Sequence, residues 1–209
     1  NKVLINSDAV IVTSEKLKNL FLNITTNVFK ITNGFDYINK EVNLDKKFSI
    51  SHVGSLYPER NPKFLWDVLE ELFDGSLFSD LQINFIGNTS EKIKKELSKR
   101  KFKKSIKFYD YVDHNKATEL MCSSQVLLMV EVNDEESSYA IPGKLFDYLN
   151  SKRPIISIGP TDSEVAQILN NTASGKFFNY REAHSLKSHI KKLYDRFKNG
   201  SGSLLKSHR

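Results

Sequence analysis

Short, strongly apolar runs alternate with amphipathic stretches along most of this chain. Runs with the length of strands occupy 48–53, 81–86, 106–111, 126–130, 154–158 and 176–178. Helical spacing of apolar positions marks 62–73, 91–101, 116–122, 144–150, 163–169 and 181–197. Because strands that alternate with helices are joined by crossovers, we predict an α/β domain with a doubly wound, mostly parallel sheet and helices on both faces.

Ahead of these runs, a separate strand–helix–strand pattern opens the chain. The run 8–13 has the character of a strand, and Ser14 is well placed to cap the helix that follows. A second short strand over 28–31 ends at the turn signal Asn33-Gly34. This piece is too small to form a domain by itself.

We therefore divide the chain into three parts. Residues 1–38 are interpreted as the end of a preceding domain with the interdomain linker, and the opening on Asn1 rather than Met suggests a piece of a longer protein. Residues 39–180 form the predicted α/β domain. Residues 181–209 form a C-terminal helix and a flexible tail.

Composition limits the class of protein. With 209 residues, 39% hydrophobic and 27% charged, the chain suits a soluble globular protein. Its longest apolar runs, such as 126–130, are too short to span a bilayer. Cys122 is the only cysteine, so no intrachain disulfide can form, which fits a reducing cytoplasm, and we expect a core position for it.

The net charge of +6 favours anionic partners, and much of the excess lies between residues 92 and 107. We interpret this stretch as a solvated helix face and the loop after it. It lacks the exposed aromatic face of an interfacial helix, although a peripheral membrane association remains compatible with the charge. Without an interleaved aromatic platform, we do not expect nucleic-acid binding.

Candidate chemistry follows the predicted strands, because open parallel sheets bind ligands at the carboxyl ends of their strands. After the first strand, Gly54 and Ser55 permit close approach of a ligand to the backbone. Arg60 stands just before a helix, and Pro62 suits its first turn, so the guanidinium could fork onto a phosphate. An ordinary turn with an exposed arginine is an equal alternative at this point.

A second candidate loop opens the helix at 144–150. Pro142 and Gly143 punctuate its start, and Lys144 adds positive charge to unpaired backbone donors. Asp147 lies on the same helix face, where a carboxylate could accept hydrogen bonds from a ribose diol. A surface pair between Lys144 and Asp147 is the alternative interpretation.

Taken together, these segments carry a family resemblance that covers nearly the whole chain. The segments are DAVIVTSE at 8–15, ITNGFD at 31–36, VGSL at 53–56, RNP at 60–62, IPGKLFDYL at 141–149 and KRPII at 152–156. In this order they resemble the C-terminal, donor-binding domain of retaining glycosyltransferases of family 4. The GT-B fold of that family has two facing Rossmann-like domains.

The resemblance implies a role for each candidate. Arg60 would contact the donor diphosphate, Asp147 the ribose, and Tyr111 and Val112 the nucleobase. Lys144 and the amides of 138–143 would face the sugar and phosphates. The predicted catalytic residues are Arg60 and Lys144, and the predicted donor-binding residues are Gly54, Ser55, Arg60, Tyr111, Val112, Ile141, Pro142, Gly143 and Asp147. The donor would be linked to UDP or GDP, and no metal is expected.

The chain also departs from the family pattern. The family often has a second acid eight residues before the ribose acid, and here that position is Tyr139. Glu135 and Glu136 lie close enough in sequence to compensate. Asp147 replaces the usual glutamate and is one methylene shorter. Both changes concern the donor sugar rather than the fold.

The predicted reaction moves a sugar from a nucleoside diphosphate to an acceptor hydroxyl with retention, in surface polysaccharide or glycolipid biosynthesis. The acceptor would lie mainly on the missing N-terminal domain, so we expect this piece alone to be inactive. The cytoplasm, at the inner face of the plasma membrane, is the expected location. One alternative is a sugar-nucleotide 2-epimerase, although the five histidines form no convincing acid–base set. The other is a non-catalytic α/β module with a basic helix.

Overall fold

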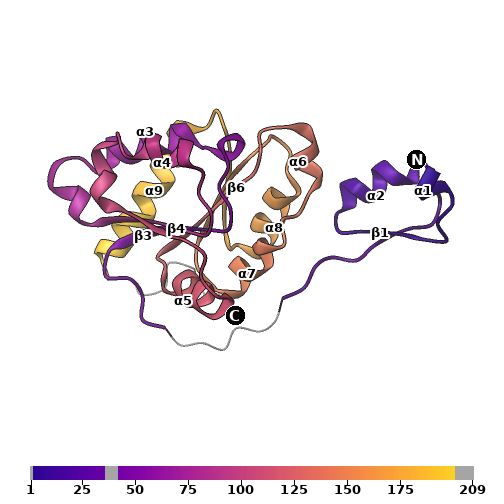
Figure 1. The fold of residues 1–209 in the computed structure, drawn as a ribbon, viewed down its shortest axis with the longest axis horizontal. Coiled ribbons are helices and arrows are strands. Elements are labelled where there is room, and N and C mark those ends of the chain that lie inside the picture. The colour runs from indigo at the N-terminus through magenta and orange to yellow at the C-terminus, as the bar shows by residue number, and fades with distance from the viewer. Residues whose placement is uncertain (1, 36–41, 201–209) are drawn as a thin grey trace.

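A six-stranded parallel sheet organises the computed structural model, which describes residues 2–35 and 42–200 (Figure 1). Its strands are β3 (Phe48–Val53), β4 (Leu81–Ile86), β5 (Ile106–Tyr109), β6 (Val126–Val130), β7 (Ile155–Gly159) and β8 (Gly175–Asn179). They lie in the order β5-β4-β3-β6-β7-β8, and every neighbouring pair is parallel. The predicted doubly wound parallel sheet is therefore confirmed.

Helices cover both faces of this sheet. They are α3 (Lys63–Leu72), α4 (Glu91–Leu97), α5 (His114–Ser123), α6 (Glu135–Tyr139), α7 (Lys144–Asn150), α8 (Glu164–Thr172) and α9 (Ala183–Lys198). Helices α3, α4 and α9 contribute to one apolar core, and α5, α7 and α8 to the other. Strand β6 supplies both cores, because Leu128 and Val130 belong to the first while Leu127 and Met129 belong to the second. Its uninterrupted apolar run is what burial on two faces requires.

Several boundaries differ from the prediction. Strand β5 ends at Tyr109 rather than at 111, and α4 ends at Leu97, before a 3₁₀ turn, η3 (Lys101–Ser105). Helix α6 was not predicted, and it begins where the Asp134 side chain accepts a hydrogen bond from the Ser137 amide at 2.8 Å. Cys122 is buried in the core, as expected.

The C-terminal helix α9 is part of the core of the sheet domain. Leu186, Ile190 and Leu193 are buried against it. The Tyr194 ring also packs against Phe48, with ring centroids 5.5 Å apart. The predicted tail beyond residue 200 and Asp36 of the predicted linker lie outside the described residues.

The N-terminal unit, at the right of Figure 1, buries fewer of its apolar side chains than the sheet domain does. It consists of α1 (Lys2–Ile5), β1 (Val10–Val12), α2 (Glu15–Leu22) and β2 (Val28–Lys30), with β1 and β2 parallel. The predicted cap is confirmed, because the Ser14 hydroxyl accepts a hydrogen bond from the Leu17 amide at 3.1 Å. Ile11 and Phe29 nevertheless expose 65% and 55% of their surface, so this unit does not complete a core of its own.

Lys16 joins the N-terminal unit to the sheet domain. The Lys16 amide donates to Glu164 Oε1 at 2.6 Å, and the Lys16 ammonium pairs with Asp162 Oδ2 at 2.6 Å. Both acidic residues belong to the loop after β7 or to the start of α8. Within the described part of the chain, no helix has the length and apolarity needed to cross a membrane.

Candidate functional site

The strand order reverses between β3 and β6, which are neighbours in the middle of the sheet. In an open parallel sheet, a crevice for ligands forms at the carboxyl ends of such a pair. The loop after β3 begins at Gly54, which has a φ of +104°. A side chain there would be strained, and its Cβ would lie 3.9 Å from Lys144 Nζ. The glycine therefore brings backbone and ammonium together at the switch point.

Arg60 ends a 3₁₀ turn, η1 (Pro58–Arg60), that follows this glycine. The next residue, Asn61, fixes the turn from both sides. Its amide donates to Glu96 Oε2 at 2.9 Å and its carbonyl accepts from the Trp66 indole at 2.7 Å. No ion pair of the described residues includes Arg60. Asn61 thus fixes the turn that carries Arg60, whose guanidinium is not neutralised by an ion pair with any described residue.

Lys144 reaches the same place from the first turn of α7. Its ammonium donates to the carbonyl of Val53, at the end of β3, at 3.3 Å, across 91 positions of sequence. Burial and then the positive charge of Arg60 lower the pKa of Lys144 to about 8, against the opposing effect of Glu131. The two predicted catalytic residues are therefore brought together by the fold.

Tyr148 secures α7 in this position. Its side chain is fully buried, and its hydroxyl accepts from the Val53 amide at 2.9 Å and donates to the Leu128 carbonyl at 3.2 Å. The hydroxyl thus ties the helix to both central strands. Because Tyr148 lies one turn after Lys144, it also sets where the ammonium points. Sequence reasoning did not single out this residue.

A small pocket of about 80 Å³ lies between these groups. It is lined by Arg60, Val130, Glu131, Val132, Ser137, Ala140, Pro142 and Lys144. The sequence analysis also missed Glu131, which follows β6 directly and is only 4% exposed. Burial raises the pKa of Glu131 to about 7, although a hydrogen bond from Ser163 and the charges of Lys144 and Arg60 oppose the shift. An acid directly after a buried strand was the available signal.

The other predicted residues are buried to different degrees, and most of them do not line this pocket. Ile141 is buried, Pro142 lines the pocket, and Ser55, Asp147 and Val112 are partly exposed, while Gly143 is exposed and caps α7. Tyr111 is 94% exposed beyond the end of β5. Neither Tyr111 nor Val112 lines the pocket. Their predicted role beside a nucleobase stays a prediction.

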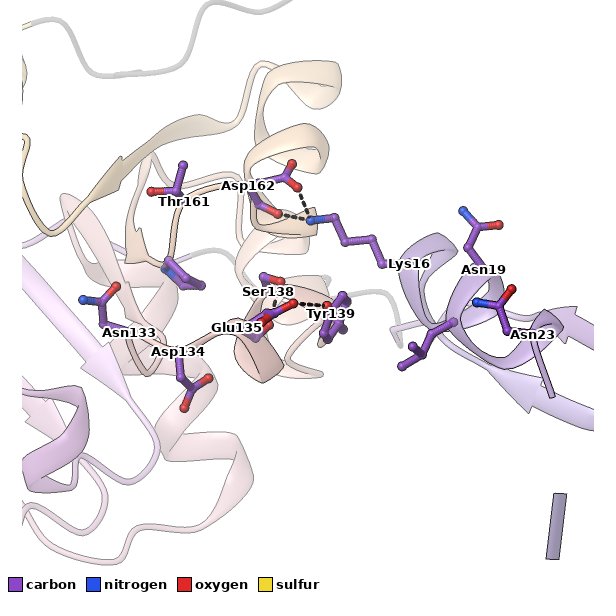
Figure 2. Close-up of a pocket in the computed structure, with 12 residues that line it drawn as sticks. Lys16, Asn19, Asn23, Asn133, Asp134, Glu135, Ser138, Tyr139, Thr161 and Asp162 are labelled. Atoms are coloured by element: carbon purple, nitrogen blue, oxygen red, sulfur yellow. Dashed lines mark hydrogen bonds and ion pairs between the residues drawn. The ribbon is translucent and has the colours of Figure 1, made fainter. Parts of the chain in front are cut away.

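A second and larger hollow, of about 650 Å³, lies between α2 and the loops after β6 and β7 (Figure 2). Tyr139 lines it, and its hydroxyl donates to Glu135 Oε1 at 2.7 Å. The Lys16 ammonium lies 5.9 Å from the centre of the Tyr139 ring. The residue that replaces the family's second acid is therefore engaged in this hollow by a neighbouring glutamate. Across the described residues, no group of three or more His, Cys, Asp or Glu side chains could hold a metal ion.

Comparisons with known proteins identify the fold. No family model matches the chain, and no curated protein matches it. Among solved structures, TarM superposes with a TM-score of 0.72 at 16% identity, over 98% of this chain and 40% of TarM. WaaG, a glycosyltransferase involved in lipopolysaccharide biosynthesis, gives 0.68 at 13% identity, over 88% of this chain and 52% of WaaG. HepE of Anabaena, solved with UDP-glucose, gives 0.69 at 11% identity, over 95% of this chain and 56% of HepE.

The chain therefore has the Rossmann-like fold of one half of a GT-B glycosyltransferase, as the sequence resemblance implied. It spans about half the length of the structures it matches. At such low identity the likeness concerns the fold, and the site must be argued from this chain's own residues.

Proposed function

We propose that this chain is the donor-binding half of a glycosyltransferase that moves a sugar from a nucleoside diphosphate to an acceptor hydroxyl with retention. The observation that carries this proposal is the convergence of Arg60 and Lys144 beside Gly54 at the switch point of the sheet. Two cations that form no ion pair with any described residue, next to the backbone of a glycine, are suited to a diphosphate. HepE and TarM structures that contain UDP support UDP as the first nucleotide to test.

The main chemical task of the site would be to stabilise the departing diphosphate. Arg60 would fork onto phosphate oxygens, while the Lys144 ammonium would add a point charge on the opposite wall. The supporting structure is in place before the ligand arrives, because the Asn61 contacts fix the turn that carries Arg60, and Val53 and Tyr148 hold Lys144 and its helix. Charge that is already oriented toward the leaving group lowers the barrier without further rearrangement. Asp147 would accept hydrogen bonds from the ribose, and Tyr111 and Val112 would lie beside the base.

The acceptor would enter from the side of the N-terminal unit. The larger hollow lies between that unit and the loops that follow β6 and β7. Exposed apolar residues on β1 and β2, such as Ile11 and Phe29, fit a unit whose remaining cover comes from a preceding domain. We accordingly propose that the chain alone binds nucleotide but transfers no sugar. We also propose a role in surface polysaccharide or glycolipid assembly at the cytoplasmic membrane face. The lipopolysaccharide enzymes WaaG and WaaB among the structural neighbours support the polysaccharide part of this proposal.

A calorimetric and thermal-shift panel of UDP, GDP, ADP and CMP tests the donor site. We expect selective stabilisation by one diphosphate, which Arg60→Ala and Asp147→Ala both abolish. Arg181→Ala is the matched control, because Arg181 is exposed and its backbone amide bonds to Asn179 outside the pocket. Absence of any response, in a wild-type chain that is folded by circular dichroism, would remove the proposed function.

A further inference from the structure

The Glu131 carboxyl group is the least satisfied part of the small pocket. Its side chain is 4% exposed and lines the pocket together with Arg60 and Lys144. Oxygen Oε2 accepts a hydrogen bond from the Ser163 hydroxyl at 3.0 Å, whereas Oε1 is buried and has no hydrogen-bond partner among the residues that the structure describes. A buried carboxylate oxygen without a partner is costly, so a position that keeps one calls for a bound group.

The surrounding structure is shaped to hold this carboxyl in place. The Glu131 amide donates to the Ile158 carbonyl at 2.8 Å, and its carbonyl accepts from the Tyr180 hydroxyl at 2.8 Å. Opposite the side chain lies Gly159, where a Cβ would stand 2.4 Å from Oε2. Only glycine leaves this space open. The backbone and Oε2 of Glu131 are thus engaged, and Oε1 is the polar atom of this residue that has no hydrogen-bond partner among the described residues.

The charges around Oε1 select the kind of group that can bind there. Lys144 and Arg60 are close enough to influence Glu131 electrostatically, yet neither is within ion-pair distance of it in the described structure. A phosphate oxygen would be drawn to the two cations and repelled by the carboxylate. A hydroxyl group can instead donate a hydrogen bond to Oε1.

We infer that Glu131 is a donor-binding residue whose Oε1 accepts a hydrogen bond from a hydroxyl of the donor sugar. This inference rests on the proposed function, because it places the diphosphate at Arg60 and Lys144 and the sugar beside them. Tyr139 takes no part in it, since Tyr139 lines the larger hollow and donates to Glu135 there. Glu131 would therefore contribute to the preference for the sugar rather than for the nucleotide.

Calorimetry on the full chain separates the sugar contact from the nucleotide contact. The ligands are UDP, UDP-glucose, UDP-galactose and UDP-N-acetylglucosamine, with GDP and GDP-mannose as a second pair. The measured quantity is the ratio of the Kd for the nucleoside diphosphate to the Kd for its sugar conjugate. Glu131→Met keeps the volume but removes the acceptor, so we expect this ratio to fall about tenfold, although loss of the carboxylate that repels phosphate should tighten binding of the diphosphate and of its conjugate alike.

Glu131→Gln keeps a carbonyl acceptor and should retain most of the sugar preference. Ser163→Ala removes the hydroxyl that donates to Oε2 and loosens the carboxyl without deleting Oε1, so it should lower the ratio less than Glu131→Met does. Should Glu131→Met fail to fold, Gly159→Ala provides the same readout, since the added Cβ displaces the carboxyl from its position.

Three results would overturn the inference, and they are distinguishable. An unchanged ratio in Glu131→Met, with the diphosphate bound at least as tightly as in the wild type, would leave the diphosphate site intact but remove the sugar contact. Equal losses for diphosphate and conjugate would show that Glu131 acts only through Lys144 and Arg60. A wild-type chain whose diphosphate affinity is not increased by any of the sugars would also exclude the contact. A folded wild-type chain that binds neither UDP nor GDP would instead contradict the proposed function itself.

Discussion

Two arginines of this domain occupy opposite electrostatic situations. Arg100, after α4, lies among Asp67, Glu70 and Glu96, with its guanidinium 3.4 Å from Glu70 Oε2 and 3.6 Å from Glu96 Oε1. Arg60, at the switch point, has Lys144 as a neighbour and no ion pair among the described residues. Nearby acids form ion pairs with Arg100, whereas the acid nearest the pocket of Arg60, Glu131, lies beyond ion-pair distance of it among the described residues.

The pKa values show the same contrast. Burial works against the charge of Arg100, yet the carboxylates of Asp67 and Glu70 raise its pKa overall. At the switch point, burial and the charge of Arg60 lower the pKa of Lys144 to about 8. A cation that is destabilised by its own surroundings contributes little to folding. The charge of Arg100 therefore stabilises the fold, whereas the charges of Lys144 and Arg60 are left for the proposed anionic ligand.

Replacing Lys144, the neighbour of Arg60 in the pocket, gives the largest expected effect. Lys144→Met should weaken diphosphate binding about 10- to 100-fold, because a charge-assisted hydrogen bond contributes roughly 1.5–3 kcal/mol. The melting temperature should stay the same or rise, since a partly desolvated ammonium is replaced by an apolar side chain of similar length. Calorimetry and thermal unfolding measure the two quantities.

Lys103→Met is the matched control for that variant, because Lys103 is exposed in the basic stretch on η3. Its affinity for nucleotide should equal that of the wild type. A loss of affinity in Lys103→Met, with none in Lys144→Met, would contradict the contrast and favour a module that binds polyanions through its basic surface.

Measuring diphosphate affinity as a function of pH tests the role of Lys144 further, with a smaller expected change in affinity. Because Lys144 loses its proton as pH rises through about 8, diphosphate affinity should fall about tenfold between about pH 7 and about pH 9. Glu131, whose pKa is about 7, becomes charged over the lower part of this range and repels phosphate as well, so the titration is best run in Glu131→Gln. Arg60 keeps its charge throughout.

Lys144→Arg separates the titration of Lys144 from that of Glu131, because arginine does not titrate in this range. We expect a flat affinity profile in the double variant with Glu131→Gln. If the slope above pH 8 persists there, a group other than Lys144 is responsible, and the description of Lys144 as a titrating ligand contact is wrong.

Removing the paired arginine should have the smallest effect, and on stability alone. Arg100→Ala should lower the free energy of unfolding by about 1 kcal/mol, because its partners remain partly exposed to water. Nucleotide affinity should not change. Urea denaturation combined with calorimetry checks both, and a double-mutant cycle with Glu70→Gln isolates the pair. Weaker nucleotide binding in Arg100→Ala would show that the two clusters are not independent.

Much of the fold could be read from local patterns. The apolar runs that predict β3, β4 and β6 match the observed strands, because burial on two faces leaves an uninterrupted apolar signature in the sequence. Strand β5 was predicted two residues too long, since Tyr111 has strand character but no partner strand there. The Arg60 and Lys144 loops were found by the rule that ligands bind at the carboxyl ends of parallel strands.

What the sequence determined by itself is therefore the alternation of strands and helices and the loops that follow them, because periodicity and turn residues act over a few positions. Only the tertiary structure decided which groups meet. The Glu131 carboxyl depends on Ser163, 32 positions away, and on the space left by Gly159. The Lys144 ammonium depends on Val53, 91 positions away. Such contacts arise from strand order and register, which bring distant segments together after the local elements are already specified.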